Sequence, residues 1–223
     1  MTQLHMEQCE LTYEGAFVKP AFSLGDCRGK LCDLLLDALE PFGCTGVDLA
    51  LEEGEPAEQG VACQVDELDA RVTVYGDRVE VSCPKFVVGS VAGISTVLEN
   101  VWSRLAGLNV GAVAKTHSVL FEADMRIRGA SYQEALNRLA QPPESLPAGT
   151  ETAIVYYLPG EPSRGFAESN LVLNRSYGAE HGLQVSATLV YEAESVKPEA
   201  SVLSAYNRFR ELLGNLGLAS AED

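Results

Sequence analysis

Six cysteines are the residues of this 223-residue chain whose chemistry would be easiest to recognise, because paired thiolates bind zinc. The nearest pair, Cys27 and Cys32, is five residues apart on a predicted helix, which turns the two side chains away from each other. Structural zinc sites use pairs roughly two to four residues apart. We therefore predict no metal site and interpret the cysteines as small buried residues that stay reduced. The six are Cys9, Cys27, Cys32, Cys44, Cys63 and Cys83.

Histidine can act as a general base, but the three histidines do not group with a nucleophile. His5 is near the start of the chain, His117 falls on the apolar face of a predicted strand, and His181 stands in a predicted turn. The sequence contains no G-x-S-x-G motif, no G-x-G-x-x-G motif and no phosphate-binding Gly-Lys-Ser/Thr signature. We therefore predict no catalytic residue and no bound cofactor.

Acidic side chains dominate the charge: 32 Asp and Glu stand against 16 Lys and Arg, for a formal net charge of -16. This charge opposes binding to nucleic acid, because phosphate contacts need Lys and Arg. No basic residue interrupts the sequence between Lys30 and Arg71, which predicts a surface that attracts a basic protein. The alternative is a solvated face that only aids solubility. Four glutamates of this region are predicted to bind the partner: Glu52, Glu53, Glu55 and Glu58.

A second candidate contact element is the loop 159–166, in which Gly and Pro residues interrupt regular structure. Arg164 and Phe166 carry the kinds of side chain that anchor protein interfaces, so we predict that they contribute to partner binding. The alternative is a plain surface connection.

The elements that must position these residues follow from the spacing of apolar side chains. Spacings of three and four predict helices over 24–39, 94–105, 132–139 and 198–216. Ser131 and Glu134 form a capping box before the third helix, and residues 141–149, with three prolines, predict a connection. Alternation with a period of two predicts strands over 11–17, 47–51, 71–75, 78–82, 117–128, 153–158, 167–175 and 183–191.

The order strand, helix, strands, helix occurs twice, once in the acidic N-terminal half, 1–110, and once in 111–223. We therefore predict an α+β fold with a predominantly antiparallel sheet covered on one face by helices, and an internal duplication. The halves are expected to pack as one compact unit around a continuous curved sheet. No apolar run approaches the roughly 20 residues of a membrane span, and the first residues do not resemble a secretion signal, so we expect a cytoplasmic protein.

These observations favour a non-enzymatic protein-binding component, either an assembly subunit or an acidic inhibitor or immunity-type factor. We expect a protein partner with a basic surface, no nucleic acid and no membrane, and we leave self-association open. The alternative is a small-molecule-binding or enzymatic domain whose pocket lies between sheet and helices. Four residues would line that pocket: Tyr156, Asn170, Asn174 and Tyr191.

Overall fold

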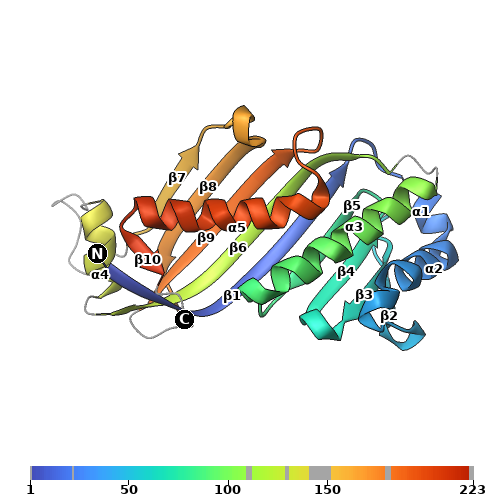
Figure 1. The fold of residues 1–223 in the computed structure, drawn as a ribbon, viewed down its shortest axis with the longest axis horizontal. Helices are drawn as coiled ribbons and strands as arrows, with labels where there is room; N and C mark the ends of the chain where they lie inside the picture. Colours follow the sequence, from blue (N-terminus) through green and yellow to red (C-terminus); the bar gives the residue numbers. More distant parts are fainter. Residues whose placement is uncertain are drawn as a thin grey trace.

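A computed structural model describes residues 2–21, 23–108, 112–128, 131–140, 152–178 and 182–220. Within these residues the strands form one ten-stranded sheet in the order β2-β3-β4-β5-β1-β6-β9-β8-β7, with β10 paired to β1 (Figure 1). Pairing along this path is antiparallel throughout, whereas β10 runs parallel to β1. The α+β class and the predominantly antiparallel sheet are confirmed. The internal duplication stays a prediction.

Each half has the expected order of elements. The N-terminal half contains β1 (Thr2–Phe17), α1 (Ser23–Asp26), α2 (Arg28–Leu39), β2 (Leu49–Glu52), β3 (Gly60–Val65), β4 (Ala70–Tyr75), β5 (Arg78–Cys83) and α3 (Val91–Gly107). The C-terminal half contains β6 (Ala114–Arg128), α4 (Tyr132–Leu139), β7 (Ile154–Leu158), β8 (Phe166–Arg175), β9 (Gly182–Glu192), α5 (Pro198–Asn215) and β10 (Leu218–Ser220).

The two halves share one sheet because the long central strands β1 and β6 pair along most of their length. Alternation places Leu11 and Tyr13 of β1 on the same face as Val119 and Phe121 of β6, and all four side chains are buried. Apolar residues of the neighbouring strands continue this face, so a single hydrophobic core runs through both halves.

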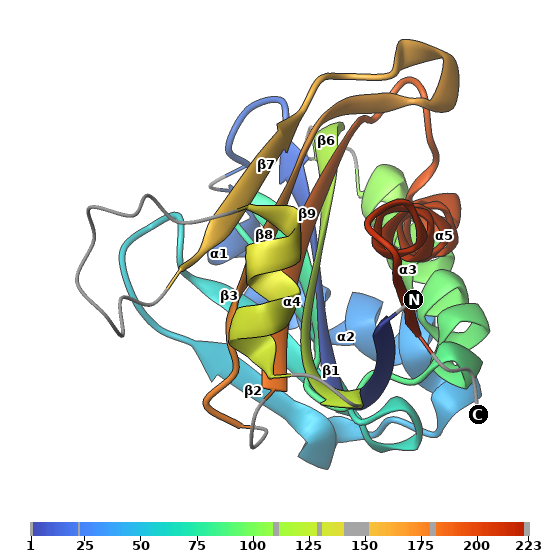
Figure 2. The same ribbon diagram turned by 90° about the vertical axis from the view of Figure 1, so that its left-hand side faces the viewer.

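The helices α3 and α5 cross the sheet on that apolar face, as Figures 1 and 2 show. On α3, the Trp102 indole Nε1 donates a hydrogen bond to the Tyr13 hydroxyl of β1 at 3.0 Å. On α5, the ring of Phe209 stacks on Phe121 of β6 with centroids 5.2 Å apart. These contacts explain the apolar stripes of both helices.

The helices α2 and α4 lie on the same side of the sheet. The Asn100 amide of α3 donates to the Ala38 carbonyl of α2 at 3.0 Å, which fixes these helices side by side. On α4, the Tyr132 ring contacts the Arg175 guanidinium, and Arg175 shares the apolar face of β8 with Leu173. The predicted covering of one face by helices is confirmed.

Several elements differ from the predicted ones: β10 was not predicted, and β2 begins at Leu49 rather than at residue 47. The helix predicted over 24–39 is interrupted at Cys27, which adopts φ -111° and ψ 30°. The strand β3 escapes the sequence analysis because both of its faces are buried, so GVACQV lacks polar alternation. The strand β1 begins at Thr2 rather than Leu11, because polar side chains fill much of its first half. His181 and the predicted connection 141–149 lie outside the described residues.

None of the helices that the structure describes combines the length and the apolar character needed to cross a membrane.

Candidate interaction surface

No described helix lies over the face of the sheet opposite α3 and α5 (Figure 2), although Ala62 of β3 and Thr73 of β4 are buried on this face. Its central side chains are short and polar, as shown by Thr12 of β1, Ser118 of β6 and Thr188 of β9, which are half-buried between neighbouring strands. An antiparallel sheet can leave one face in water, so uncovered area alone does not define a binding surface. A binding surface is instead defined by the charge and the apolar character of the side chains on this open face.

Carboxylates dominate the open face. Glu10 of β1 lies directly opposite Glu122 of β6, and both side chains are exposed. Among the described residues neither carboxylate has a basic partner, and Glu10 Oε1 accepts a hydrogen bond from Gln8 Nε2 at 3.0 Å. Register places eight acidic residues on this face: Glu10, Glu14, Glu52, Glu80, Glu122, Asp124, Glu168 and Glu192.

Register places four arginines on the open face: Arg71, Arg78, Arg126 and Arg128. Each of the first three is bound to a carboxylate other than Glu10 or Glu122. Arg78 lies 3.8 Å from Glu14 and 3.6 Å from Glu80, which themselves face each other across β1 and β5. These pairs leave the negative charge at the centre of the sheet uncompensated. The other two arginine pairs are Arg126 with Glu7 and Arg71 with Glu52.

A small hollow of about 80 Å³ opens on this face between β1, β6 and β9. A buried water occupies about 10–15 Å³ on this measure, so the hollow has room for a few waters or for the head of one side chain. It is far smaller than the roughly 300–1,000 Å³ of small-molecule sites. Its polar lining consists of Gln8, Glu10, Glu122, Asp124 and Gln184.

An apolar patch adjoins the carboxylates on the C-terminal half of the open face. On the edge strand β7, Tyr157 is 83% exposed and Val155 is also exposed. Val172 of β8 lies directly opposite Val155, while Leu120 and Val190 are half-buried nearby. An exposed aromatic residue beside aliphatic residues, with polar groups around them, is the composition of a protein-binding surface.

The four predicted glutamates lie at the other edge of the sheet. Glu52 ends β2 and pairs with Arg71, whereas Glu53, Glu55 and Glu58 are exposed in the connection between β2 and β3. The strand β2 is four positions from β1, roughly 19 Å at about 4.8 Å per strand. The structure therefore does not bring these glutamates together with Glu10 and Glu122. The structure does not test their predicted role in partner binding, and Glu10 and Glu122 form a separate candidate site.

The loop 159–166 is attached to α5 by ion pairs. Arg164 contacts Glu211 of α5 at 2.8 Å, and Glu161 of the loop pairs with Arg208 of the same helix. Phe166 is buried against a tyrosine ring of β9, with centroids 4.7 Å apart. Of the two predicted contact residues, Arg164 keeps an accessible side chain and Phe166 does not.

The predicted pocket between sheet and helices does not assemble from the expected residues. Tyr156 and Tyr191 lie on the apolar face, and Tyr191 is fully buried. Asn170 and Asn174 lie on the open face, opposite Thr188 and Gln184. The sheet itself separates the two pairs, so this grouping was wrong: alternation along a strand sends neighbouring positions to opposite faces.

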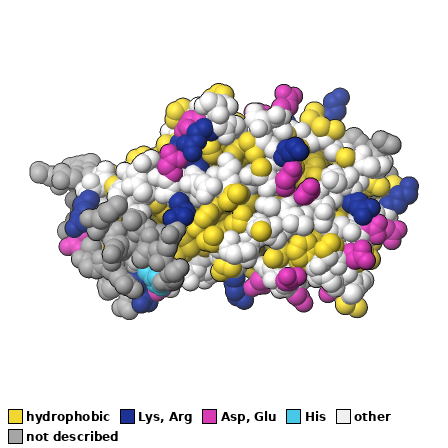
Figure 3. Space-filling model, in the orientation of Figure 1, with side chains coloured by type: hydrophobic (Ala, Val, Ile, Leu, Met, Phe, Trp, Pro, Cys, Tyr) yellow, Lys and Arg dark blue, Asp and Glu magenta, His cyan; other side chains and the backbone are white. Residues whose placement is uncertain are grey.

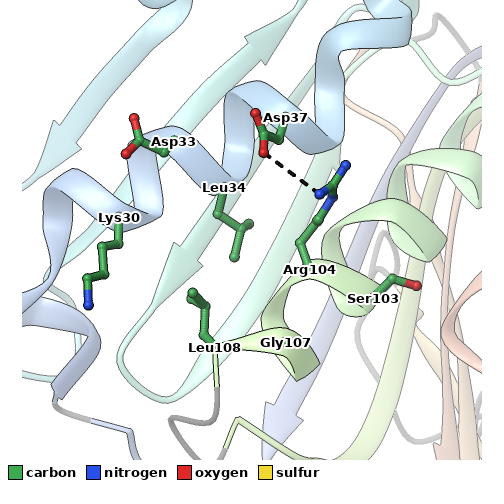
Figure 4. A pocket seen from close by; sticks show the side chains of 8 residues that line it. All are labelled: Lys30, Asp33, Leu34, Asp37, Ser103, Arg104, Gly107 and Leu108. Atoms are coloured by element: carbon green, nitrogen blue, oxygen red, sulfur yellow. Dashed lines mark ion pairs between the residues drawn. The ribbon is translucent and has the colours of Figure 1, made fainter.

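A cavity of about 470 Å³ lies instead between α2 and the end of α3 (Figure 4). Leu34 and Leu108 point into it from opposite sides, and an ion pair between Asp37 and Arg104 at 3.7 Å spans one end. Its volume falls within the range of small-molecule sites. This cavity is the feature that favours a small ligand.

A buried polar cluster joins the halves beneath the helices. Trp102 is a donor only, so its hydrogen bond makes the Tyr13 oxygen an acceptor. Among the described residues the Tyr13 proton then has one acceptor, Nδ1 of His117 at 2.8 Å, which places the imidazole proton on Nε2. Burial lowers the pKa of His117 to about 4, while the Glu199 carboxylate acts in the opposite direction. His117 is thus neutral at pH 7 and shielded from solvent.

The six cysteines are free thiols. Cys44 and Cys63 both donate to the Gln64 carbonyl, at 3.4 and 3.7 Å. Burial raises the pKa of the Cys63 thiol to about 12, which disfavours the reactive thiolate. Across the part of the chain that is described, no three His, Cys, Asp or Glu side chains group to hold a metal ion.

A scan against protein-family models finds none that matches this chain, and a search of curated proteins finds no match either.

Proposed function

We propose that this chain is a non-enzymatic protein-binding component that receives its partner on the open sheet face. The observation that carries the proposal is the exposed Tyr157 beside Val155 on a sheet face that no helix covers in the described residues. Tyrosine supplies a large, rigid contact area at low entropic cost, and interface hot spots are enriched in it.

The dimensions of the face support this function. Tyr157, Asn170, Thr188, Leu120 and Thr12 form one cross-strand row over five strands. Five strands span roughly 20 Å, and the 11 residues of β9 extend roughly 35 Å, which gives an area on the order of 700 Å². A protein contributes about 800 Å² to an interface of standard size.

The protein acts, in this proposal, as an assembly subunit or an acidic inhibitor in the cytoplasm. Six free thiols support a reducing compartment, because disulfides persist mainly in oxidising ones.

Native mass spectrometry of the protein purified gently from its own cells tests the proposal. We expect a stoichiometric protein partner, and we expect Tyr157→Ala to weaken its binding roughly 30-fold, the effect of losing about 2 kcal/mol at a hot spot. Tyr177→Ala is the matched control, because Tyr177 is 85% exposed but lies in the turn after β8. A monomer without a protein partner, or equal effects of both substitutions, would reject the proposal.

The cavity between α2 and α3 supports a second candidate function, small-molecule binding. The same spectra would then show a reproducible small ligand on the monomer. Leu108→Trp, which places a bulky ring in the cavity, would weaken binding of that ligand, whereas Tyr157→Ala would leave it bound.

A further inference from the structure

We infer that the partner is basic and that its Lys or Arg side chains lie over the central carboxylates Glu10, Glu122 and Asp124 of the open face. This inference rests on the proposed function and adds the chemistry of the partner. The occupant is a protein segment in which cationic side chains accompany an apolar anchor.

The first argument is charge complementarity. Register places eight carboxylates and four arginines on the open face, and Arg71, Arg78 and Arg126 are engaged elsewhere on it or at its margin. A directly opposed pair such as Glu10 and Glu122 destabilises a sheet unless a cation lies between the carboxylates. A partner's ammonium or guanidinium group supplies that cation.

The helix-bearing face shows the contrasting arrangement. In Figure 3, acidic and basic side chains lie next to one another on that face. There Arg208 bridges Glu161 and Glu211, so the carboxylates are neutralised within the chain. The open face lacks such a cation at its centre within the described residues, which leaves the position to a partner.

The second argument is the shape of the carboxylate region. Asp124 is held by the Ser176 hydroxyl, which donates to Oδ1 at 2.6 Å. The hollow of about 80 Å³ beside Glu10 and Glu122 matches the head of one long basic side chain rather than a metabolite. Gln8 and Gln184 complete it with further oxygen acceptors, which suit the several N–H donors of an arginine.

The third argument is the position of the apolar patch. The strand β6, with Glu122, is three strand positions from β7, with Tyr157, or roughly 14 Å. The partner therefore presents its cationic groups roughly 14 Å from an apolar anchor. Apolar contact at Tyr157 supplies affinity, while the charges steer association and set the register of the complex.

A short peptide of alternating arginine and serine serves as the probe, titrated into the isotope-labelled full chain and followed by NMR amide shifts. We expect the shifts to centre on the strands that carry Glu10 and Glu122. Replacing both residues, Glu10→Gln with Glu122→Gln, should weaken peptide binding about tenfold. The matched control, Glu53→Gln with Glu55→Gln, removes the same charge from the connection between β2 and β3 and should change affinity less than about twofold.

Three results of the peptide titration would each overturn the inference: equal weakening in both double variants, amide shifts centred on residues 53–58, or no binding of the peptide.

The natural partner distinguishes failure of this inference from failure of the proposed function. If the natural partner co-purifies with the Glu10→Gln, Glu122→Gln variant at unchanged affinity and salt dependence, protein binding stands and the basic docking is rejected. If no partner co-purifies with the unsubstituted protein, the function itself fails.

Discussion

Glu10 and Glu122 lie directly opposite each other on the two central strands, with both carboxylates exposed on the face that no described helix covers. Like charges in directly opposed positions destabilise a sheet. Proteins commonly tolerate such costs where a surface is used for binding. The repulsion between Glu10 and Glu122 lowers the stability of the isolated chain, and a cationic group of the partner would relieve it.

Replacing Glu122 by Gln should therefore stabilise the isolated protein by about 0.5 kcal/mol, because it removes the repulsion and keeps the side-chain shape. Urea unfolding at low salt measures the change, and the gain should shrink in high salt, which screens exposed charges. Glu53→Gln, in the connection after β2, is the control and should change stability less. A Glu122→Gln variant no more stable than wild type would contradict the account of this pair.

His117 should make the stability of the protein depend on pH. Its pKa is lowered by burial to about 4, whereas an unfolded histidine titrates near about 6.5. Between these values the unfolded state binds more protons, so the free energy of unfolding is highest above about 6.5 and falls as the pH drops to about 4. The loss amounts to about 3 kcal/mol by the linkage relation.

Fluorescence of Trp102, the single tryptophan, reports unfolding in urea at each pH because its indole belongs to the same cluster. His117→Gln is the control, since Gln keeps an acceptor for the Tyr13 hydroxyl and does not titrate. The same fall in stability between pH 6.5 and 4 in both proteins would show that another group is responsible.

Gly15 should not tolerate a side chain. A Cβ atom at this position would lie 2.4 Å from Cζ2 of Trp102 and 2.6 Å from the Tyr13 hydroxyl. Gly15→Ala should thus cost about 1–3 kcal/mol and shift the Trp102 emission, because the cluster must move to admit the methyl group. Gly107→Ala is the matched control: its Cβ meets nothing within 4 Å and α3 gains a better helix former. Similar stabilities for both variants would contradict this packing.

The ion pairs that attach the loop 159–166 to α5 should be unequal. Arg208 has a side chain only 12% exposed and bridges Glu161 and Glu211, whereas the Arg164 side chain is 45% exposed. Arg208→Ala should cost about 2 kcal/mol, because it removes the less exposed of the two cations that neutralise Glu161 and Glu211 and leaves them only Arg164. Arg164→Ala should cost less than about 1 kcal/mol, as exposed pairs do. Thermal unfolding measures both, and the reverse order would contradict the structure.

Most helices and strands could be predicted from the sequence, because each exposes one face to solvent and buries the other. Polar and apolar residues therefore alternate with the period of the element. The helix α3 and the strand β6 carry clean periods, and the capping box at Ser131 and Glu134 forms as predicted. The strand β3 was not predictable from alternation, because Val61 and Ala62 are both fully buried on opposite faces. The signal for β3 is its short apolar run, which periodicity alone does not assign.

The open face was not predictable because its features depend on pairing. Glu10 and Glu122 are distant in sequence and meet only through the register of β1 and β6. The apolar run of β7 resembles a buried strand, and Tyr157 is exposed because it lies on the open face of this edge strand. Phe166 resembled a loop anchor, yet it begins β8 and faces the core. Sequence supplies the residue types, and strand order decides which of them reach solvent.

Carboxyl footprinting of the native complex tests the central claim most directly, since it reports which carboxylates a bound partner covers. We expect Glu10 and Glu122 to be labelled far less in the complex than in the free protein, while Glu53 and Glu55 are labelled equally in both. Protection of Glu53 and Glu55 with unchanged labelling of Glu10 and Glu122 would contradict the claim that the open sheet face receives the partner.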